Sequence, residues 1–179
     1  IESGFPAQQI VYAGVGKSDQ EIKLALQHNI LCFNVESVAE LQVINEIAAQ
    51  QNQVARVCLR INPDVAAHTH QFIATGKAEN KFGIAYADMM EVIQIASRLE
   101  HIQLIGLHFH IGSQITDMND YIHLCERINT IQSMLEEQSI HLSLINVGGG
   151  LGVDYENPTI GAIPDFKAYF EVFAQYLQL

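Results

Sequence analysis

The sequence predicts an α/β fold in which parallel strands alternate with helices. Five short apolar runs have the composition of strands, and each is followed by a segment with apolar residues at helical spacing. Strands that alternate with helices form right-handed β–α–β units on a parallel sheet. No linker, short-period repeat or low-complexity stretch interrupts the pattern, so we expect one domain. The strands are expected at residues 10–16, 30–35, 54–61, 104–110 and 142–147.

Serine and aspartate residues mark the expected helix starts. Ser18 is followed three residues later by Glu21, and Ser37 by Glu40, which is the pattern of a capping box. Asp88 is expected to open a further helix, and an aspartate near the C-terminus is expected to cap a final helix that runs to the end of the chain. The remaining helix is expected over residues 118–137. The aspartate expected at the start of the final helix is Asp165.

Five β/α units are compatible with two architectures. One is an open, doubly wound sheet, and the other is part of an eight-unit barrel, which needs about 250 residues when complete. Composition does not decide between them. Both architectures bind ligands at the carboxyl ends of the strands, so the location of the site is the same in each case. Polar or glycine residues follow these strand ends at Lys17, Glu36, Asn62, His110, Ser113 and 148–150.

Composition restricts the partners of this chain. Of its 179 residues, 49% are hydrophobic and 16% charged, which predicts a globular protein. Twenty acidic residues against 9 basic ones give a formal charge of −11, which disfavours nucleic acid or an anionic membrane as a partner. No apolar run approaches the roughly 20 residues of a membrane span. We therefore expect a small-molecule ligand, with any anion held by backbone N–H groups and a few side chains.

The cysteines indicate the compartment. There are three, an odd number, and Cys32 and Cys58 lie in apolar strand-like runs. We interpret them as buried thiols of a reducing compartment, and therefore expect a cytoplasmic protein without disulfides.

A glycine turn follows the fifth strand. Gly148, Gly149, Gly150 and Gly152 are four glycines among five residues. Without Cβ atoms, such a turn lets backbone N–H groups approach an anion, and phosphate is the natural guest. The alternative is a tight turn of purely structural use. The dinucleotide-binding pattern G-x-G-x-x-G is absent, because Val153 stands three residues after Gly150.

Histidines occupy the fourth strand and its end. Alternation puts His108 and His110 on one face of the strand, with His110 at its open end beside Ser113, whose hydroxyl is placed to donate to a phosphate. The His-x-His spacing, which recurs at residues 68–70, also suggests a metal. Because only Glu36 offers a further ligand at a strand end, we expect no metal site. For His108, a structural role in the core remains equally open.

Two basic residues need interpretation. Arg60 ends a buried strand and needs an acceptor, which is a phosphate, a ring oxygen of a ligand or an internal acidic residue. Lys17, at the start of a helix, is expected to be a surface lysine and not one that binds a ligand covalently.

Several segments together carry a family resemblance that covers essentially the whole chain. GVGKSDQEI, FNVESVAEL, RINPDV, NKFGI, GLHFHIGSQI and VGGGLGVDY follow one another in this order. The order and wording resemble the diaminopimelate decarboxylases, which are fold-type III pyridoxal-phosphate enzymes with an alanine-racemase-like barrel. The combination of HFHIGSQ with VGGGLG is the most specific part.

The resemblance implies a fold and a reaction. Residues 1–179 would be the central part of a pyridoxal-phosphate-binding barrel, a partial (β/α)8 TIM barrel of about five consecutive units. The N-terminal units and a C-terminal β-domain would lie outside the chain. The implied enzyme is a carboxy-lyase that removes CO₂ from the amino acid meso-diaminopimelate to give L-lysine, the last step of lysine biosynthesis, and is a homodimer.

The resemblance also implies residue roles. His110 would stack on the pyridine ring, and Ser113 with the backbone of Gly148, Gly149 and Gly150 would hold the phosphate. We count Arg60 with these cofactor-binding residues. The lysine that binds the cofactor covalently in this family has no counterpart here, so no catalytic residue is assigned and the chain alone is expected to be inactive.

Three alternatives stay open. One is a related decarboxylase for ornithine or arginine. Another is a non-catalytic barrel with a binding or regulatory role. The last is a phosphate-binding α/β enzyme that uses no pyridoxal phosphate.

Overall fold

The computed structural model describes residues 1–65, 82–157 and 165–178. The chain divides into two compact units. The first unit comprises residues 1–61, 82–109 and 142–146, and the second comprises residues 62–81, 110–141 and 147–179. Each unit is described by itself.

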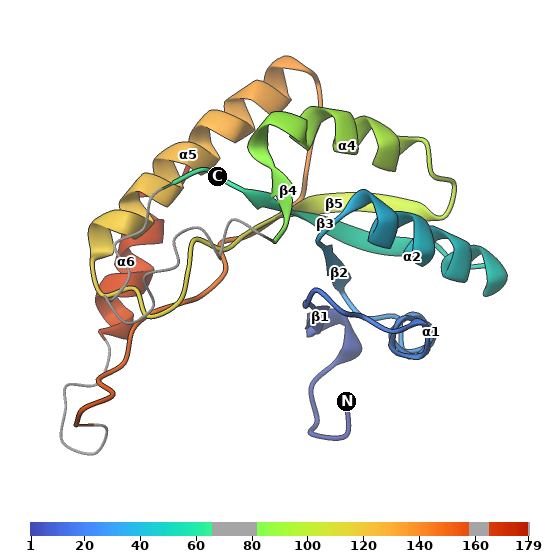
Figure 1. The fold of residues 1–179 in the computed structure, drawn as a ribbon, viewed down its shortest axis with the longest axis horizontal. Coiled ribbons are helices and arrows are strands. Elements are labelled where there is room, and N and C mark those ends of the chain that lie inside the picture. Colours follow the sequence, from blue (N-terminus) through green and yellow to red (C-terminus); the bar gives the residue numbers. More distant parts are fainter. Residues whose placement is uncertain (66–81, 158–164, 179) are drawn as a thin grey trace. The chain divides into compact units, whose positions relative to one another are not determined.

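The first unit is built on a sheet whose main strands are parallel (Figure 1). Along the sheet their order is β1, β2, β3, β5 and β6, and the short β4 pairs with β3. All five predicted strands are confirmed, although the first, second and last are shorter than expected, and the short β4 was not predicted. Their bounds are β1 (Val11–Tyr12), β2 (Cys32–Val35), β3 (Ala55–Asn62), β4 (Ile84–Ala85), β5 (Ile102–Phe109) and β6 (Leu144–Asn146).

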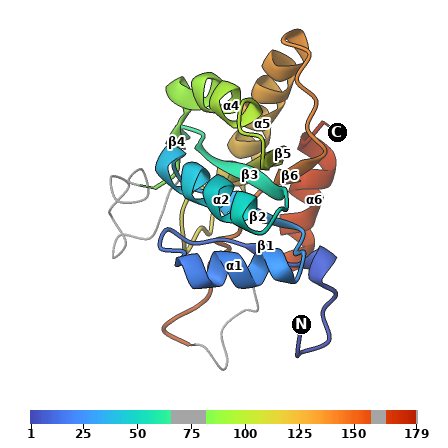
Figure 2. The same cartoon turned by 90° about the vertical axis from the view of Figure 1, so that its right-hand side faces the viewer.

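Three helices among the described residues cover this sheet. Contacts join α1 to α2 and α2 to α4, and Figure 2 shows the three helices following one another across the sheet, in the order of the strands. This neighbour-to-neighbour order is what successive β–α–β crossovers of one hand produce. Their bounds are α1 (Asp19–Gln27), α2 (Val38–Gln50) and α4 (Met89–Ser97), with short 3₁₀ turns η1 (Ala7–Gln9) and η3 (Tyr86–Asp88). Each helix buries an apolar face: Ile22 and Leu26; Leu41, Ile44 and Ile47; Met89, Val92 and Ile93.

Register separates an apolar from a polar face on β3, β5 and β6. Leu59 pairs with Leu107, and Ile61 with Phe109, and all four side chains are fully buried. On the opposite face, Arg60 pairs with His108, which in turn pairs with Asn146. Because paired residues of parallel strands point to the same side, a row of polar groups crosses the sheet close to the carboxyl ends of its strands.

The capping predictions hold only in part. The box at Ser18 is confirmed, because Glu21 N–H donates to Ser18 Oγ (3.4 Å) while the Ser18 N–H donates to the Glu21 carboxylate (2.8 Å). Ser37 accepts from the Glu40 N–H (3.2 Å). The Glu40 carboxylate, however, accepts the N–H of Glu36 (2.7 Å) instead of that of Ser37, so the predicted second box is wrong.

The two aspartate caps also differ from each other. Asp88 opens a helix as predicted, because α4 begins at Met89, but it has helical angles (φ −94°, ψ −6°) at the end of η3 and its side chain makes no capping hydrogen bond. A cap residue needs extended backbone to aim its oxygen at the first turn, and the preceding 3₁₀ turn removes that geometry. Asp165 does cap, by accepting the N–H of Ala168 (2.9 Å), but its helix ends at Tyr176 before the chain does.

The second unit contains α5 (Met118–Glu137), whose predicted bounds are confirmed, and α6 (Phe166–Tyr176), which packs against it. The side chain of Asn129 on α5 donates to Tyr176 O (2.8 Å) and accepts from Gln178 N–H (2.9 Å), which fixes the end of α6. Across residues 1–65, 82–157 and 165–178, no helix combines the length and apolar character that a bilayer crossing requires.

Candidate functional site

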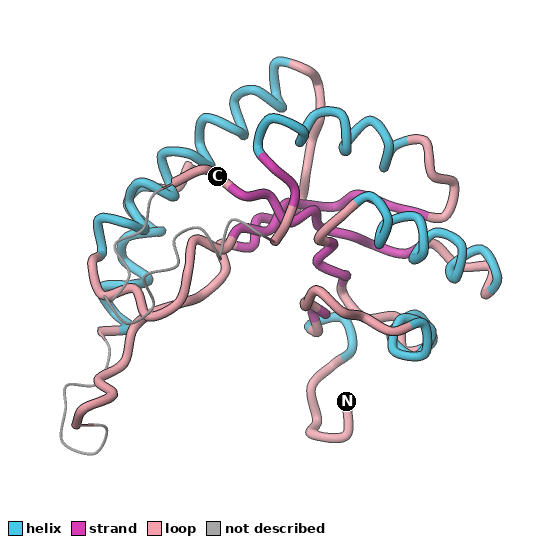
Figure 3. Tube along the Cα trace, in the orientation of Figure 1, coloured by secondary structure: helices cyan, strands magenta, loops and turns pink. Residues whose placement is uncertain are grey.

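The loops that follow β5 and β6 are joined to each other. Ile115 N–H donates to Gly150 O, and Gly152 N–H donates to Ile115 O, both at 2.8 Å, which makes a parallel bridge between Ile115 and Leu151. Figure 3 shows these two loops running side by side between strands and helices. The structure therefore brings the predicted segment of His110 and Ser113 together with the predicted glycine turn.

A glutamine side chain clamps the same two loops. Gln114 is buried and has a left-handed backbone (φ 60°). Its amide oxygen accepts the N–H of Val153 (3.0 Å), and its amide nitrogen donates to Val153 O. A primary amide that pairs with both groups of one residue imitates a strand neighbour and leaves no buried polar atom unsatisfied. Sequence reasoning missed this residue, because nothing in the local pattern shows which backbone a glutamine will reach.

A glycine is required at position 150 because the backbone of another loop lies very close to it. Gly150 has φ 94°, a region that side chains disfavour, and an added Cβ would collide with the carbonyl oxygen of Gly112. Gly149, in contrast, has open space where a Cβ would stand. The turn is thus tightly packed on the side of the His110 loop and open at Gly149.

The open side of the turn presents backbone donors. Tyr121 Oη donates to Gly149 O (3.4 Å), and Tyr169 Oη donates to Gly148 O (3.3 Å), so two carbonyl groups are turned toward the helices. Within the described parts of the chain, the N–H groups of Gly149 and Gly150 have no protein acceptor. Backbone N–H groups that face outward from a glycine turn form an anion-binding concavity.

His110 and Ser113 stand on the loop that this turn touches. His110 is half-buried directly after β5, and Ser113 is exposed. The structure therefore places His110, Ser113 and the three glycines in one compact unit.

Arg60 belongs to the first unit and meets an acidic partner there. Its Nη1 donates to both carboxylate oxygens of Glu36 at 2.9 Å, and its guanidinium lies 5.9 Å from the centre of the Phe82 ring. The side chains of Arg60 and Glu36 are only 11% and 7% exposed. Nε and Nη2, which carry three of the five guanidinium N–H groups, have no acceptor among the described residues. The cofactor-binding role of Arg60 stays a prediction.

The prediction that Lys17 is a surface lysine is wrong. Its side chain is 1% exposed and not on the surface. Nζ donates to Gly14 O (2.7 Å), Asn34 O (2.7 Å) and Glu40 Oε1 (2.5 Å). These three bonds use every N–H of an ammonium group. Lys17 therefore ties together the segment after β1, strand β2 and helix α2, and has no donor left for a ligand.

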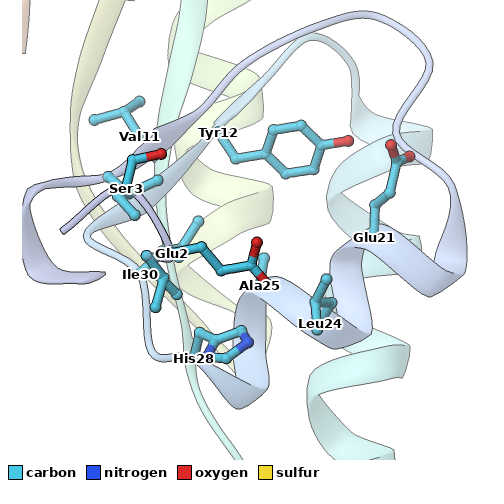
Figure 4. A pocket seen from close by; sticks show the side chains of 11 residues that line it. Glu2, Ser3, Val11, Tyr12, Glu21, Leu24, Ala25, His28 and Ile30 are labelled. Carbon is cyan, nitrogen blue, oxygen red and sulfur yellow. The ribbon is translucent and has the colours of Figure 1, made fainter. Parts of the chain in front are cut away.

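A separate pocket of about 510 Å³ lies in the first unit beside β1 and α1 (Figure 4). Apolar side chains make up much of its wall, while Glu2, Glu21 and His28 supply polar groups. Hydrogen bonds from Ser18 lower the pKa of Glu21, which keeps this carboxyl ionised. Two carboxylates disfavour a phosphate, so this pocket is not the candidate site.

The cysteines are buried thiols, as predicted. Cys32, Cys58 and Cys125 are free and buried, and Sγ of Cys32 lies 3.7 Å from Sγ of Cys58. Burial raises the pKa of Cys125 to about 11. Among the described residues no three His, Cys, Asp or Glu side chains cluster as metal ligands, and the predicted His-x-His pattern at residues 68–70 lies outside them.

Parallel β/α units with a glycine turn at a strand end are typical of α/β proteins that bind a phosphate group, including (β/α)8 barrels. The chain belongs to the family of pyridoxal-dependent decarboxylases, whose pyridoxal-binding domain matches residues 1–178.

Individual relatives agree with this family. The chain is 58% identical to the diaminopimelate decarboxylase of Bacteroides thetaiotaomicron over 179 residues, 100% of this chain and 46% of that protein. It is 42% identical to the Haemophilus influenzae enzyme of the same name, over 100% of this chain and 43% of that protein. The crystal structure of the Helicobacter pylori enzyme complexed with L-lysine matches with a TM-score of 0.81 and 37% identity, over 99% of this chain and 45% of that one.

The comparison settles the architecture. The fold is α/β and is part of a (β/α)8 barrel, as in these decarboxylases. The chain spans about half the length of the curated relatives that it matches. The family uses pyridoxal phosphate. The glycine turn, in which the N–H groups of Gly149 and Gly150 have no acceptor among the described residues, suits the phosphate of that cofactor.

Proposed function

We propose that this chain is the central, cofactor-binding part of a diaminopimelate decarboxylase, which converts meso-diaminopimelate into L-lysine and CO₂. The observation that carries the proposal is the pairing of the loop of His110 and Ser113 with the glycine turn through Ile115 and Gln114. This pairing gathers a flat imidazole, a hydroxyl and outward-facing backbone donors within one unit. The 58% identity to a diaminopimelate decarboxylase favours this substrate over ornithine or arginine.

The residues take distinct parts in this proposal. His110 stacks on one face of the pyridine ring and keeps water from it. Ser113 Oγ and the backbone of Gly148, Gly149 and Gly150 bind the phosphate, with the N–H groups of Gly149 and Gly150 as the backbone donors. When bound, pyridoxal phosphate supplies the electron sink for the pair left behind as CO₂ departs. Arg60, held by Glu36, directs its remaining N–H groups to a ring oxygen or another acceptor of the cofactor.

The rest of the proposal concerns the whole protein. The lysine that anchors the cofactor and the acidic partner of the pyridine nitrogen would come from other parts of the polypeptide. Residues 1–179 alone would then release no CO₂. The whole protein would be a cytoplasmic homodimer, and its buried free thiols support a reducing compartment.

Decarboxylation by the full-length protein tests the substrate. We expect CO₂ release from meso-diaminopimelate, with pyridoxal phosphate bound, and much slower release from ornithine and arginine. Ser113→Ala should weaken the binding of pyridoxal phosphate by about tenfold, because a hydrogen bond to a charged group contributes about 1.5 kcal/mol or more. Ser133→Ala, an exposed serine on α5, serves as the control.

Different outcomes would contradict different parts. Faster release of CO₂ from ornithine or arginine would indicate a decarboxylase of the ornithine or arginine type. Tight binding of pyridoxal phosphate without release of CO₂ from any amino acid would indicate a non-catalytic barrel. Absence of cofactor binding by the full-length protein would refute the proposal.

A further inference from the structure

Two buried tyrosines reach the glycine turn from different helices. Tyr121, on α5, is 0% exposed and donates to Gly149 O (3.4 Å). Tyr169, on α6, is 9% exposed and donates to Gly148 O (3.3 Å). Successive carbonyl groups of one turn are therefore held by the hydroxyls of two separate helices.

Because peptide groups are planar, these hydrogen bonds also fix the direction of the neighbouring N–H groups. In a planar trans peptide, the C=O of one residue and the N–H of the next point in opposite directions. A hydroxyl that binds Gly148 O therefore turns the N–H of Gly149 away from the helices. The hydroxyl on Gly149 O does the same for the N–H of Gly150. These are the two N–H groups that have no acceptor among the described residues.

The phenol rings are themselves fixed. Tyr121 and Tyr169 meet edge-on with ring centres 5.0 Å apart, and Phe173 lies 5.9 Å from the first and 5.0 Å from the second. Edge-to-face contacts at these separations are favourable, and helices α5 and α6 leave the rings little freedom. Burial raises the pKa of both phenols, so they remain neutral hydrogen-bond donors.

We propose that Tyr121 and Tyr169 are positioning residues, whose hydroxyls orient the Gly148–Gly150 backbone so that the N–H groups of Gly149 and Gly150 face the phosphate of the cofactor. This inference rests on the proposed function. The tyrosines touch neither phosphate nor ring and act only through the carbonyl groups of the turn. Their removal should therefore weaken recognition of the phosphate and leave recognition of the pyridine ring unchanged.

Tyrosine-to-phenylalanine variants of the full-length protein test the inference, because they remove one oxygen and keep the ring packing. Dissociation constants are measured for pyridoxal 5′-phosphate and for pyridoxal, which lacks the phosphate. Tyr121→Phe and Tyr169→Phe should each raise the dissociation constant of pyridoxal phosphate by about 3- to 10-fold, as expected for the loss of one hydrogen bond of about 0.5–1.5 kcal/mol. The double variant should lose more, and binding of pyridoxal should stay as in the parent protein.

The control is Tyr176→Phe, on the same helix as Tyr169 but 38% exposed and without a bond to the turn. It should bind both ligands normally. Equal weakening of both ligands in Tyr121→Phe and Tyr169→Phe would show a packing role and overturn the inference, as would no weakening at all. Either variant alone decides, if the other fails to fold. Failure of the unsubstituted protein to bind pyridoxal phosphate would instead sink the proposed function.

Discussion

The two units hold their strand-end segments by different chemistry. In the first unit, charged side chains do so: Lys17 with Glu40, and Arg60 with Glu36, all with little exposure. In the second unit, neutral groups do so: the amide of Gln114 and two tyrosine hydroxyls bind backbone atoms of neighbouring segments.

The difference shows how an acidic protein can position a backbone turn without charged side chains, which is what the proposed phosphate site needs. Neutral donors satisfy the carbonyl groups of the glycine turn without adding a charge, so a bound phosphate meets no carboxylate from these contacts. Charge pairs in the first unit cancel most of each other's field but make removal of one partner costly, because the other is left buried. Substitutions should therefore have larger effects on stability in the first unit and on ligand recognition in the second.

The largest effect is expected at Lys17. Lys17→Met leaves the mostly buried Glu40 carboxylate without its cation, and breaking such a pair costs about 3–5 kcal/mol. Urea unfolding of the full-length protein measures the loss. Lys167→Met is the matched control, because its pair with Glu171 is long (3.6 Å) and exposed, and should change stability by less than about 0.5 kcal/mol.

A double variant sharpens this test. In Lys17→Met/Glu40→Gln the uncompensated charge is gone, so part of the lost stability should return. If Lys17→Met cost no more than Lys167→Met, the charged network would not hold the first unit, and the contrast between the units would fail.

A smaller effect is expected at Gly150. Gly150→Ala places a Cβ against the carbonyl of Gly112 at φ 94°, and strain of this kind costs about 1–3 kcal/mol. Because the turn must then move, pyridoxal phosphate should also bind more weakly, which equilibrium dialysis measures. Gly149→Ala meets open space and should leave stability within about 0.5 kcal/mol of the parent protein. Equal losses in both variants would mean that close packing does not shape the turn.

Local signals in the sequence were sufficient for the five predicted strands and for most of the helices. They also place the candidate site residues at strand ends, and the binding role of those residues stays a prediction. Ser18 and Glu21 are three residues apart, so their capping box depends on nothing distant. The glycine turn and His110 could be placed because strand ends are evident in the apolar pattern. The second capping box failed because the Glu40 carboxylate has two other partners. One of its oxygens accepts the N–H of Glu36, and the other binds Lys17, which is 23 residues away and gives no local signal.

Other features left no sequence signal at all. Gln114 reaches Val153 across 39 residues, and Tyr121 and Tyr169 look like ordinary core residues of amphipathic helices. Their polar atoms become informative only when the two loops and two helices are seen together. Lys17 resembled a surface residue because its position at the start of a helix is usually exposed, whereas three acceptors from separate segments enclose it.

The smallest expected effect is a loss of stability at high pH that comes from the neutral phenol of Tyr121 in the second unit. Burial raises the pKa of Tyr121 above its ordinary value of 10.0, so the folded protein keeps this phenol neutral while the unfolded chain ionises. Stability from this group is fully present below pH 10 and falls as pH rises from there toward the folded-state pKa. At pH 10 the loss is about 0.4 kcal/mol for this tyrosine, because the unfolded phenol is then half ionised. Unfolding free energies at pH 8 and pH 10, compared between the parent protein and Tyr121→Phe, measure it. The parent protein should lose more, and an equal loss in both would mean that Tyr121 ionises as readily in the folded state, contrary to a neutral donor that holds the glycine turn.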